Sequence, residues 1–373
     1  MKKSIIDNLN SPIIAMSVFL ALWGSLAVFN VTFVREEHYF FALKQIVWIF
    51  FALIILLISA NLDSEFYFRF KYYFFSVFFV LLWGVLFFGI AINGMRGWYS
   101  FEGHILMQPS ELSKPIFILC IASFLTSSDY KTKISKIKEY FIYLFIGLLW
   151  IVPVLLQPDY GTALVYIISL FLLYWCLGGR ISFLAISMLL AGVFFIFVVA
   201  NEPYVLDRLR GFISPTEHSA TSGWHILQYQ NTLARGGFVG QDWGANLWSQ
   251  VYLPNPYSDS IFASIGEALG FLGLLPIFAV IAVWMSWGFL KATQLDDLRR
   301  SAVVYGLVGM LVIQAMLHIS VTVGIFPPTG VTLPMFSYGG SSLSATMFSI
   351  GMTVSMLRDG CKYTLDRPCT KRF

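Results

Sequence analysis

One aspartate stands where the chain could carry out chemistry at a membrane surface. Asp259 directly precedes an apolar run that begins at Ile261, and Glu267 follows two turns deeper in the same expected helix. An aspartate at this position can cap the helix, because its carboxylate accepts bonds from the first backbone N–H groups. It can also act as a general base toward a substrate at the membrane surface. The residues alone leave both interpretations open.

A polar cluster begins another apolar segment. Glu111 and Lys114 follow Gln108 and stand three positions apart, so they share a helical face and are expected to form an ion pair. Charged groups inside membrane segments are costly, and each is a functional candidate by default. The pair either neutralises itself and orients helices or contributes to a substrate site, and these roles are compatible.

Asp159 presents the same alternatives. It follows Pro158 in a short turn and precedes Gly161 and Thr162, where a further apolar helix is expected to begin. Capping of that helix explains the aspartate, and so does binding of a substrate at the end of a membrane segment.

Three arginines, Arg96, Arg208 and Arg210, fall in segments that the predicted topology places outside the membrane. Guanidinium groups bind phosphate in a bidentate way, so these residues suit an anionic lipid headgroup. The alternative is contact with ordinary lipid phosphate at the interface.

Two stretches, Pro327–Gly330 and Ser337–Ser342, break the helical pattern at the outer side. Non-helical backbone is tolerated at membrane depth only where it is buried in protein or lines a cavity. The pattern therefore predicts a shaped external cavity, and Ser337 is one of its candidate residues. Gln314 and His318, four positions apart, are expected to bond each other or backbone carbonyls.

The composition identifies the solvent around these residues. Hydrophobic residues make up 58% of the 373 positions and charged residues only 12%, against roughly 25% charged residues in soluble domains. The bilayer is therefore the expected solvent. The net charge of +4 is small and gives no reason to expect a nucleic-acid partner. The four cysteines match no metal or redox spacing.

The apolar segments predict an all-α, polytopic membrane protein with about ten spans, forming one membrane domain over residues 1–373. Each segment is long enough, or nearly so, to cross ~30 Å of hydrocarbon. The expected spans are 12–31, 43–60, 72–93, 107–126, 140–157, 161–177, 181–200, 261–289, 302–324 and 337–357.

Lysine and arginine counts predict the orientation. With both termini in the cytoplasm, most basic residues of the chain fall on the cytoplasmic side. These are Lys2, Lys3, Arg69, Lys71, Lys131, Lys133, Lys136, Lys138, Arg180, Lys291, Arg299, Arg300 and the tail from Arg358. Residues 201–260 then form a large extracytoplasmic loop, in which 223–233 could be an interfacial helix with Trp224 and Tyr229 at headgroup level.

These residues together resemble a known family, the SEDS proteins (shape, elongation, division and sporulation) of the RodA, FtsW and SpoVE group. Seven segments carry the resemblance, in family order. They are Asn93–Trp98 (like N-G-x-x-R-W), Gln108–Lys114 (Q-P-S-E-x-x-K), Gln157–Thr162 (Q-P-D-x-G-T), Gly223–Gly240 (G-x-x-x-x-Q…G-G-x-x-G), Leu253–Ala263 (L-P-x-x-x-x-D-x-I-F-A), Glu267–Gly270 (E-E-L-G) and Leu333–Gly340 (L-P-x-x-S-Y-G-G).

The chain departs from the family pattern around Asp259. Tyr257, Ser258 and Ser260 stand in place of the usual H-T and F, and Asn255 stands in place of a usual Glu. Further along the chain, Arg235 and Ala268 replace a usual Ser and Glu. The carboxylate of Asp259 is retained.

The resemblance implies a peptidoglycan glycosyltransferase that polymerises lipid II at the outer face of the cytoplasmic (inner) membrane, during elongation or division. The reaction would invert the anomeric centre and release undecaprenyl diphosphate from the lipid-linked glycan. Asp259 would be the catalytic base. Substrate would be bound by Arg96, Gln108, Glu111, Lys114, Asp159, Arg208, Arg210, Glu267 and Ser337.

The resemblance also implies a partner, a class B penicillin-binding protein with transpeptidase activity, besides membrane lipids. No ligand cluster demands a cofactor, although a divalent cation could assist the diphosphate. Two other functions stay open: a lipid II flippase, and a non-catalytic scaffold that activates the transpeptidase. The short termini favour the RodA type slightly over the division type.

Overall fold

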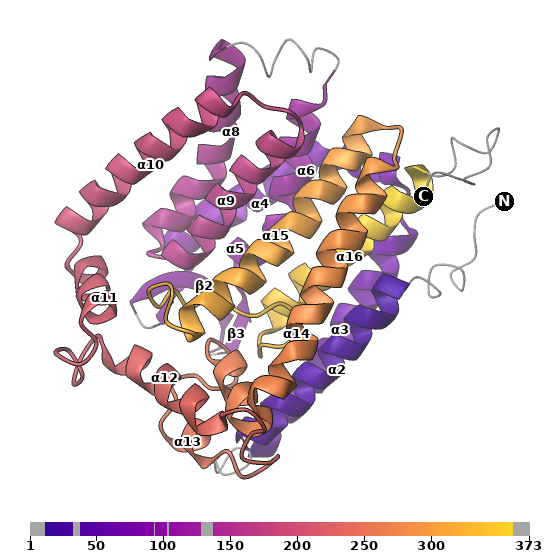
Figure 1. Cartoon of the computed structure of the whole chain (residues 1–373). Coiled ribbons are helices and arrows are strands. Elements are labelled where there is room, and N and C mark those ends of the chain that lie inside the picture. Colours follow the sequence, from indigo (N-terminus) through magenta and orange to yellow (C-terminus); the bar gives the residue numbers. More distant parts are fainter. Residues whose placement is uncertain (1–11, 33–37, 93, 103, 128–136, 361–373) are drawn as a thin grey trace.

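The computed structural model describes residues 12–32, 38–92, 94–102, 104–127 and 137–360, which form a bundle of long helices (Figure 1). The helices are α2 (Pro12–Thr32), α3 (His38–Asn61), α4 (Ser64–Phe88), α5 (Pro109–Leu112), α6 (Lys114–Leu125), α8 (Ile137–Leu156), α9 (Tyr160–Cys176), α10 (Ile181–Asn201), α11 (Pro203–Ile213), α12 (Trp224–Gly236), α13 (Leu247–Val251), α14 (Ile261–Thr293), α15 (Leu298–Thr322) and α16 (Gly340–Gly360).

Most of the expected spans coincide with helices of this bundle. In the described part of the chain, six helices are long and apolar enough to cross a membrane by themselves, namely α2, α3, α4, α8, α14 and α15. Shorter apolar helices cover Tyr160–Cys176 and Ile181–Val193. The prediction of a polytopic helical membrane protein is confirmed.

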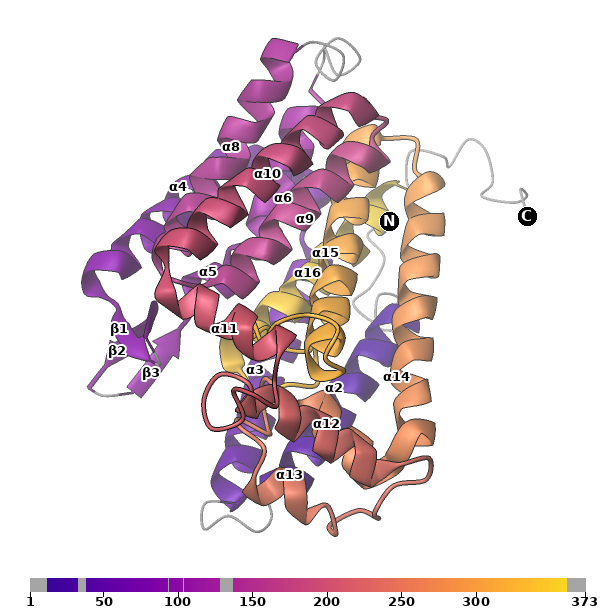
Figure 2. The same cartoon turned by 60° about the vertical axis from the view of Figure 1, so that its left-hand side comes forward.

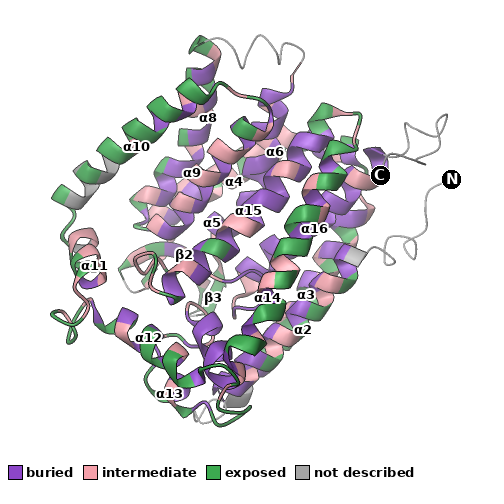
Figure 3. Cartoon of the chain, in the orientation of Figure 1, coloured by how far each residue is buried: buried purple, intermediate pink, exposed green. Residues whose placement is uncertain are grey.

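Burial separates central from peripheral helices. α15 and α16 are mostly buried, whereas α10 is largely exposed (Figure 3). Most exposed residues of α10 are apolar, including Met188, Leu189 and Ile196 at 65–69% exposure, so lipid is the solvent that suits them. α16 is rich in small and hydroxyl residues that allow close packing, as is typical of buried membrane helices, and it packs extensively against α3.

A small sheet changes two of the expected spans. The third, 72–93, is wrong at both ends, because α4 begins at Ser64 and residues 90–92 form a strand. The fourth, 107–126, is not one helix, since α5 and α6 meet at Ser113. Strands β1 (Ile90–Ile92), β2 (Met95–Phe101) and β3 (His104–Met107) pair antiparallel in that order.

α14 is interrupted at Gly270, whose φ of 66° and ψ of −170° leave the helical region. The N–H groups freed by this break bond to the preceding loop. Phe271 N donates to Gly237 O at 3.0 Å, and Leu272 N donates to Phe238 O at 3.1 Å. A break at membrane depth needs such partners, because lipid offers none.

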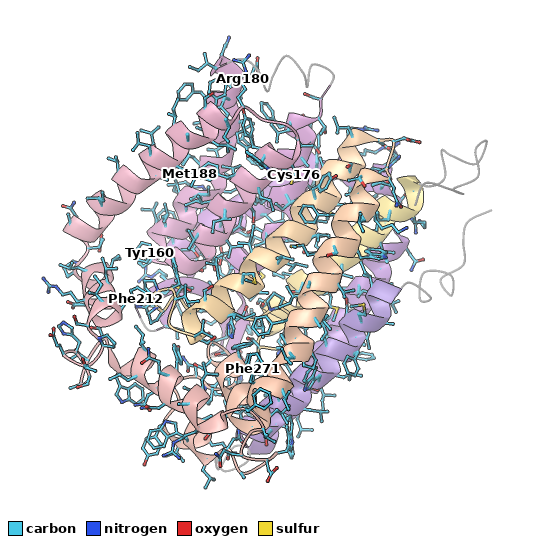
Figure 4. The ribbon with its side chains drawn as sticks, viewed as in Figure 1. Tyr160, Cys176, Arg180, Met188, Phe212 and Phe271 are labelled. Carbon is cyan, nitrogen blue, oxygen red and sulfur yellow. The ribbon has the colours of Figure 1, made fainter. Side chains whose placement is uncertain are left out.

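The sheet and helices α11–α13 lie at one end of the bundle (Figure 2). Arg180 marks the opposite end, while Phe271 lies near the end with α12 and α13 (Figure 4). The segments expected outside therefore gather at one end of the molecule. Which end faces the cytoplasm stays a prediction from the basic residues. The run Lys131–Lys138, which carries much of that prediction, lies mostly outside the described residues.

Candidate active site

An irregular segment, residues 328–332, lies among several of the predicted site residues. Arg208 of α11 donates from Nη1 to Pro328 O at 2.7 Å. From α15, His318 Nδ1 lies 2.7 Å from Val331 O, and Gln314 Nε2 donates to Thr332 O at 3.1 Å. Hence the His318 and Gln314 side chains bond to this segment, in agreement with the expected bonds to carbonyls.

The same segment lies between the two predicted aspartates. A Cβ added to Gly161 would stand 2.5 Å from Thr329 O, so only glycine lets the start of α9 approach this closely. A Cβ at Gly330 would stand 3.8 Å from Asp259 Oδ2. Asp159 is near enough to Asp259 for its charge to influence Asp259 ionisation. The turn before α9 and the turn before α14 thus meet at one site.

Asp259 sits partly buried in a polar setting. Burial raises its pKa to about 6, while hydrogen bonds from Ser258 and Asn255 and the charge of Arg208 act in the opposite direction. The N-cap of α14 is Ser260, without a side-chain cap bond. The alternative that Asp259 is the helix cap is therefore wrong. A carboxylate with a raised pKa beside an arginine is a common arrangement at catalytic sites.

Ser337 holds the loop that carries Asp259. Its hydroxyl donates to Ser258 O at 2.7 Å and accepts from Leu333 N at 2.8 Å. Tyr338 N donates to Tyr257 O at 2.8 Å, and the Tyr257 ring stacks on Phe41 of α3 at a centroid distance of 4.6 Å. Ser337 is buried, so its bonds within the protein position the loop.

Asp159 is both a cap and the centre of a hydrogen-bond cluster. Its Oδ1 accepts from Thr162 N at 3.1 Å, which caps α9. Its Oδ2 accepts from Gln108 Nε2 at 3.2 Å and from Ser110 Oγ at 3.3 Å. Burial raises the pKa of Asp159. The capping role expected from sequence is present, and the same carboxylate fixes Gln108.

Glu111 and Lys114 form the expected ion pair, with 2.6 Å between Lys114 Nζ and Glu111 Oε1. Both side chains are buried. Lys114 Nζ also donates to Gln314 Oε1 at 3.0 Å. Since Gln314 bonds Thr332, the pair is linked to the segment beside Asp259.

Glu267 has a structural role. Its two carboxylate oxygens accept from Trp248 N at 3.2 Å and from Ser249 N at 2.7 Å, and it is buried. It therefore anchors the start of α13. The expected substrate contact of Glu267 stays a prediction, and each of its carboxylate oxygens already accepts from one backbone N–H.

The other two arginines are not drawn into this cluster. Arg96 is exposed on β2 and donates to Leu86 O at 3.3 Å. Arg210 faces Asp207 across 3.7 Å, and both side chains are more than half exposed. In the described part of the chain, no group of three His, Cys, Asp or Glu side chains could hold a metal ion.

Sequence reasoning missed residues that contact the Asp259 loop. Tyr229, expected at headgroup level, is buried, and its hydroxyl is hydrogen-bonded to Ser260. Burial raises its pKa to about 12. Asn255 and Ser258 were noticed only as departures from the family pattern. That difference was the available signal for their contact with Asp259.

A family model described as "Cell cycle protein", covering FtsW, RodA and SpoVE, matches residues 10–360. The chain belongs to the FtsW/RodA/SpoVE family. This confirms the SEDS membership that the sequence motifs predicted.

Two SEDS relatives match along most of their length. Stage V sporulation protein E of Bacillus subtilis is 29% identical over 361 residues, which cover 93% of this chain and 96% of that protein. A protein of Coxiella burnetii named probable peptidoglycan glycosyltransferase FtsW is 30% identical over 348 residues, covering 91% and 92%.

Solved SEDS structures share the fold. A chain from a peptidoglycan synthase complex described as coordinating polymerization and crosslinking matches with a TM-score of 0.75 and 25% identity, over 92% of this chain and 97% of that chain. The rod shape determining protein RodA of Thermus thermophilus matches with a TM-score of 0.68 and 23% identity, over 93% and 96%.

Proposed function

We propose that this SEDS protein is a peptidoglycan glycosyltransferase that polymerises lipid II, with Asp259 as its general base. The observation that carries the proposal is the partly buried Asp259 carboxylate with its pKa raised to about 6 and the Arg208 charge beside it. This pairs a proton acceptor with a positive group at the end of the bundle where the large loop meets α14.

Asp259 and Arg208 can serve the two ends of the proposed reaction. The acceptor 4-hydroxyl of lipid II attacks C1 of the lipid-linked glycan and loses its proton to Asp259. The bond between C1 and the diphosphate oxygen breaks, and undecaprenyl diphosphate leaves with inversion at C1. A general base contributes ~10²–10⁴-fold to rate, and a guanidinium stabilises charge that develops on the departing phosphate.

The proposed substrate contacts differ in their charge. Lys114 is paired with Glu111 at 2.6 Å, so it adds little net positive charge. Arg208 therefore carries most of the proposed diphosphate binding, assisted from the rim by the exposed Arg96 and Arg210. A divalent cation bound to the diphosphate would add positive charge. Measuring polymerisation after EDTA treatment, and again after magnesium addition, tests whether such a cation contributes.

The proposed partner is a class B penicillin-binding protein. The similar chain from a peptidoglycan synthase complex supports it, because that complex joins polymerization to crosslinking. Co-expression with the cognate transpeptidase should give a complex that co-purifies and polymerises faster than the SEDS protein alone. A fully active protein that associates with no such transpeptidase would contradict the partnership.

Purified protein and labelled lipid II test the proposed function against its two alternatives. Single-turnover polymerisation should yield glycan strands, alone or with the partner. A flippase would instead move lipid II between vesicle leaflets without making strands. A scaffold would do neither, yet would raise transpeptidase activity.

A further inference from the structure

Three aromatic rings meet beside the loop that carries Asp259. The Phe41 ring of α3 stacks on the Tyr257 ring, with 4.6 Å between their centroids and 23° between their planes. The Tyr338 ring stands edge-on to both, with its centroid 5.3 Å from that of Phe41 and 5.7 Å from that of Tyr257. Aromatic pairs prefer these stacked and edge-to-face arrangements. The three rings therefore join α3, the Asp259 loop and the turn before α16.

A second contact joins α3 to the same turn. Ser337 Oγ donates to Ser258 O at 2.7 Å, next to Asp259. From α3, the buried side chain of Gln45 donates from Nε2 to Ser337 O at 3.4 Å. Gln45 and Phe41 are four positions apart, so they share one face of the helix. This face holds the Asp259 loop directly through a ring and indirectly through the Ser337 turn.

The Asp259 loop is also fixed on its other side. Ser260 Oγ donates to Pro254 O at 2.6 Å and closes the loop at the start of α14. Asp259 thus lies between a residue bonded within the loop and Tyr257, whose ring contacts α3. The position of the carboxylate relative to α3 then depends on the stacked pair.

We propose that Phe41 and Tyr257 are positioning residues for Asp259, which together hold its loop against α3. This rests on the proposed function for its effect on rate, but the holding of the loop can be measured without any activity. A misplacement of about 1 Å can cost a rate of about a hundredfold. Loosening the stack should therefore slow the reaction without weakening substrate binding.

Leucine variants separate the stack from the apolar volume, because leucine fills apolar space but cannot stack. The set is Phe41→Leu, Tyr257→Leu and the double variant. Phe50→Leu is the matched control, since Phe50 lies on the same helix, is 62% exposed and has its ring against Phe51. Thermal unfolding identifies any variant that does not fold, and Phe41→Tyr supplies a variant that keeps the ring.

The first measurement is hydrogen exchange in the full-length protein. Exchange of the backbone amides in residues 257–260 and at Tyr338, which donates to Tyr257 O, should become several-fold faster in Phe41→Leu and stay unchanged in Phe50→Leu. The second measurement is lipid II polymerisation. Phe41→Leu should lower kcat by about tenfold to a hundredfold with KM unchanged, and Phe41→Tyr should restore most of the rate.

The double variant tests whether the two rings act as one unit. Its kcat should match that of the slower single variant, because residues in contact have non-additive effects. Losses that multiply would overturn the inference, and so would wild-type exchange in Phe41→Leu or faster exchange with an unchanged kcat. A wild type that polymerises nothing would contradict the proposed function instead, and exchange alone would then decide whether α3 holds the loop.

Discussion

Lys114 donates to the side-chain oxygen of Gln314 at 3.0 Å, joining α6 to α15 inside the bundle. The same ammonium group is paired with Glu111 at 2.6 Å, and Gln314 bonds Thr332 beside the Asp259 region. One buried cation therefore links three helices to the irregular segment 328–332.

Replacing Lys114 by alanine should lower both the amount of folded protein and the activity. The change leaves Glu111 buried without its partner, a cost of about 3–5 kcal/mol for a pair of this kind. Thermal unfolding in detergent and membrane levels measure it. Arg210→Ala is the matched control for the amount of folded protein, because its pair with Asp207 is exposed and such pairs contribute little to stability.

An exchange of the two charges refines this prediction. If Glu111→Lys combined with Lys114→Glu restores full polymerisation, the pair is purely structural. We expect folding to recover only in part, because the exchanged lysine no longer stands where Gln314 accepts.

Asp259→Asn should abolish polymerisation while leaving folding intact. Asparagine retains the shape, so membrane level and partner binding should match the wild type. Loss of the base should reduce the rate by at least ~100-fold. A rate near that of the wild type would move the base elsewhere, and Asp159 would be the next carboxylate to replace.

The pH dependence of activity should follow Asp259. Its pKa is raised to about 6, and a base acts only when ionised. Activity should therefore fall as the pH drops through about 6, well above the usual range of an aspartate. A wild-type rate that stays constant down to pH ~4.5, near the ordinary aspartate pKa, would contradict this assignment.

The same carboxyl predicts a stability effect with a defined sign. Burial favours the neutral form of the Asp259 carboxyl, so the folded state binds this proton more tightly than the unfolded chain does. Wild-type stability should fall as the pH rises from about 4 toward 6, through the interval between the ordinary aspartate pKa and the raised one. Asp259→Asn should lack this contribution, which thermal unfolding across that range would reveal.

The orientation can be tested with single cysteines in a cysteine-free background. Ser219 lies exposed between α11 and α12, and Thr293 lies exposed at the end of α14. An impermeant maleimide added to intact cells should label Ser219→Cys and leave Thr293→Cys unlabelled until the cells are permeabilised. The reverse pattern would invert the topology.

Hydrophobic runs predicted the spans well because the bilayer demands long apolar helices. They failed where the backbone N–H and C=O groups are paired between strands instead of within a helix. Residues 90–92 were expected to end the helix of the span 72–93, yet they pair as a strand with β2. Hydropathy cannot distinguish a helix from a strand here, since both can contain a run of apolar side chains.

The sequence predicted which residues of the candidate site pair when they are close in the chain, but not the contacts between segments that are far apart in the chain. Spacing alone brought Glu111 and Lys114 together, because residues three apart share a helical face. The contact of Lys114 with Gln314 spans 200 positions and depends on how α6 packs on α15. Glu267 shows the converse, since its partners are backbone N–H groups, which carry no sequence signature.

The break in α14 constrains chain length in the large loop. Gly237 and Phe238 bond Phe271 and Leu272 in fixed register, and a Cβ at Gly240 would stand 2.3 Å from Ala268 O. Inserting or deleting one residue here would shift these donors away from their acceptors. Surface loops usually tolerate such length changes, so natural variation in loop length should be confined to the parts of 201–260 outside this short run.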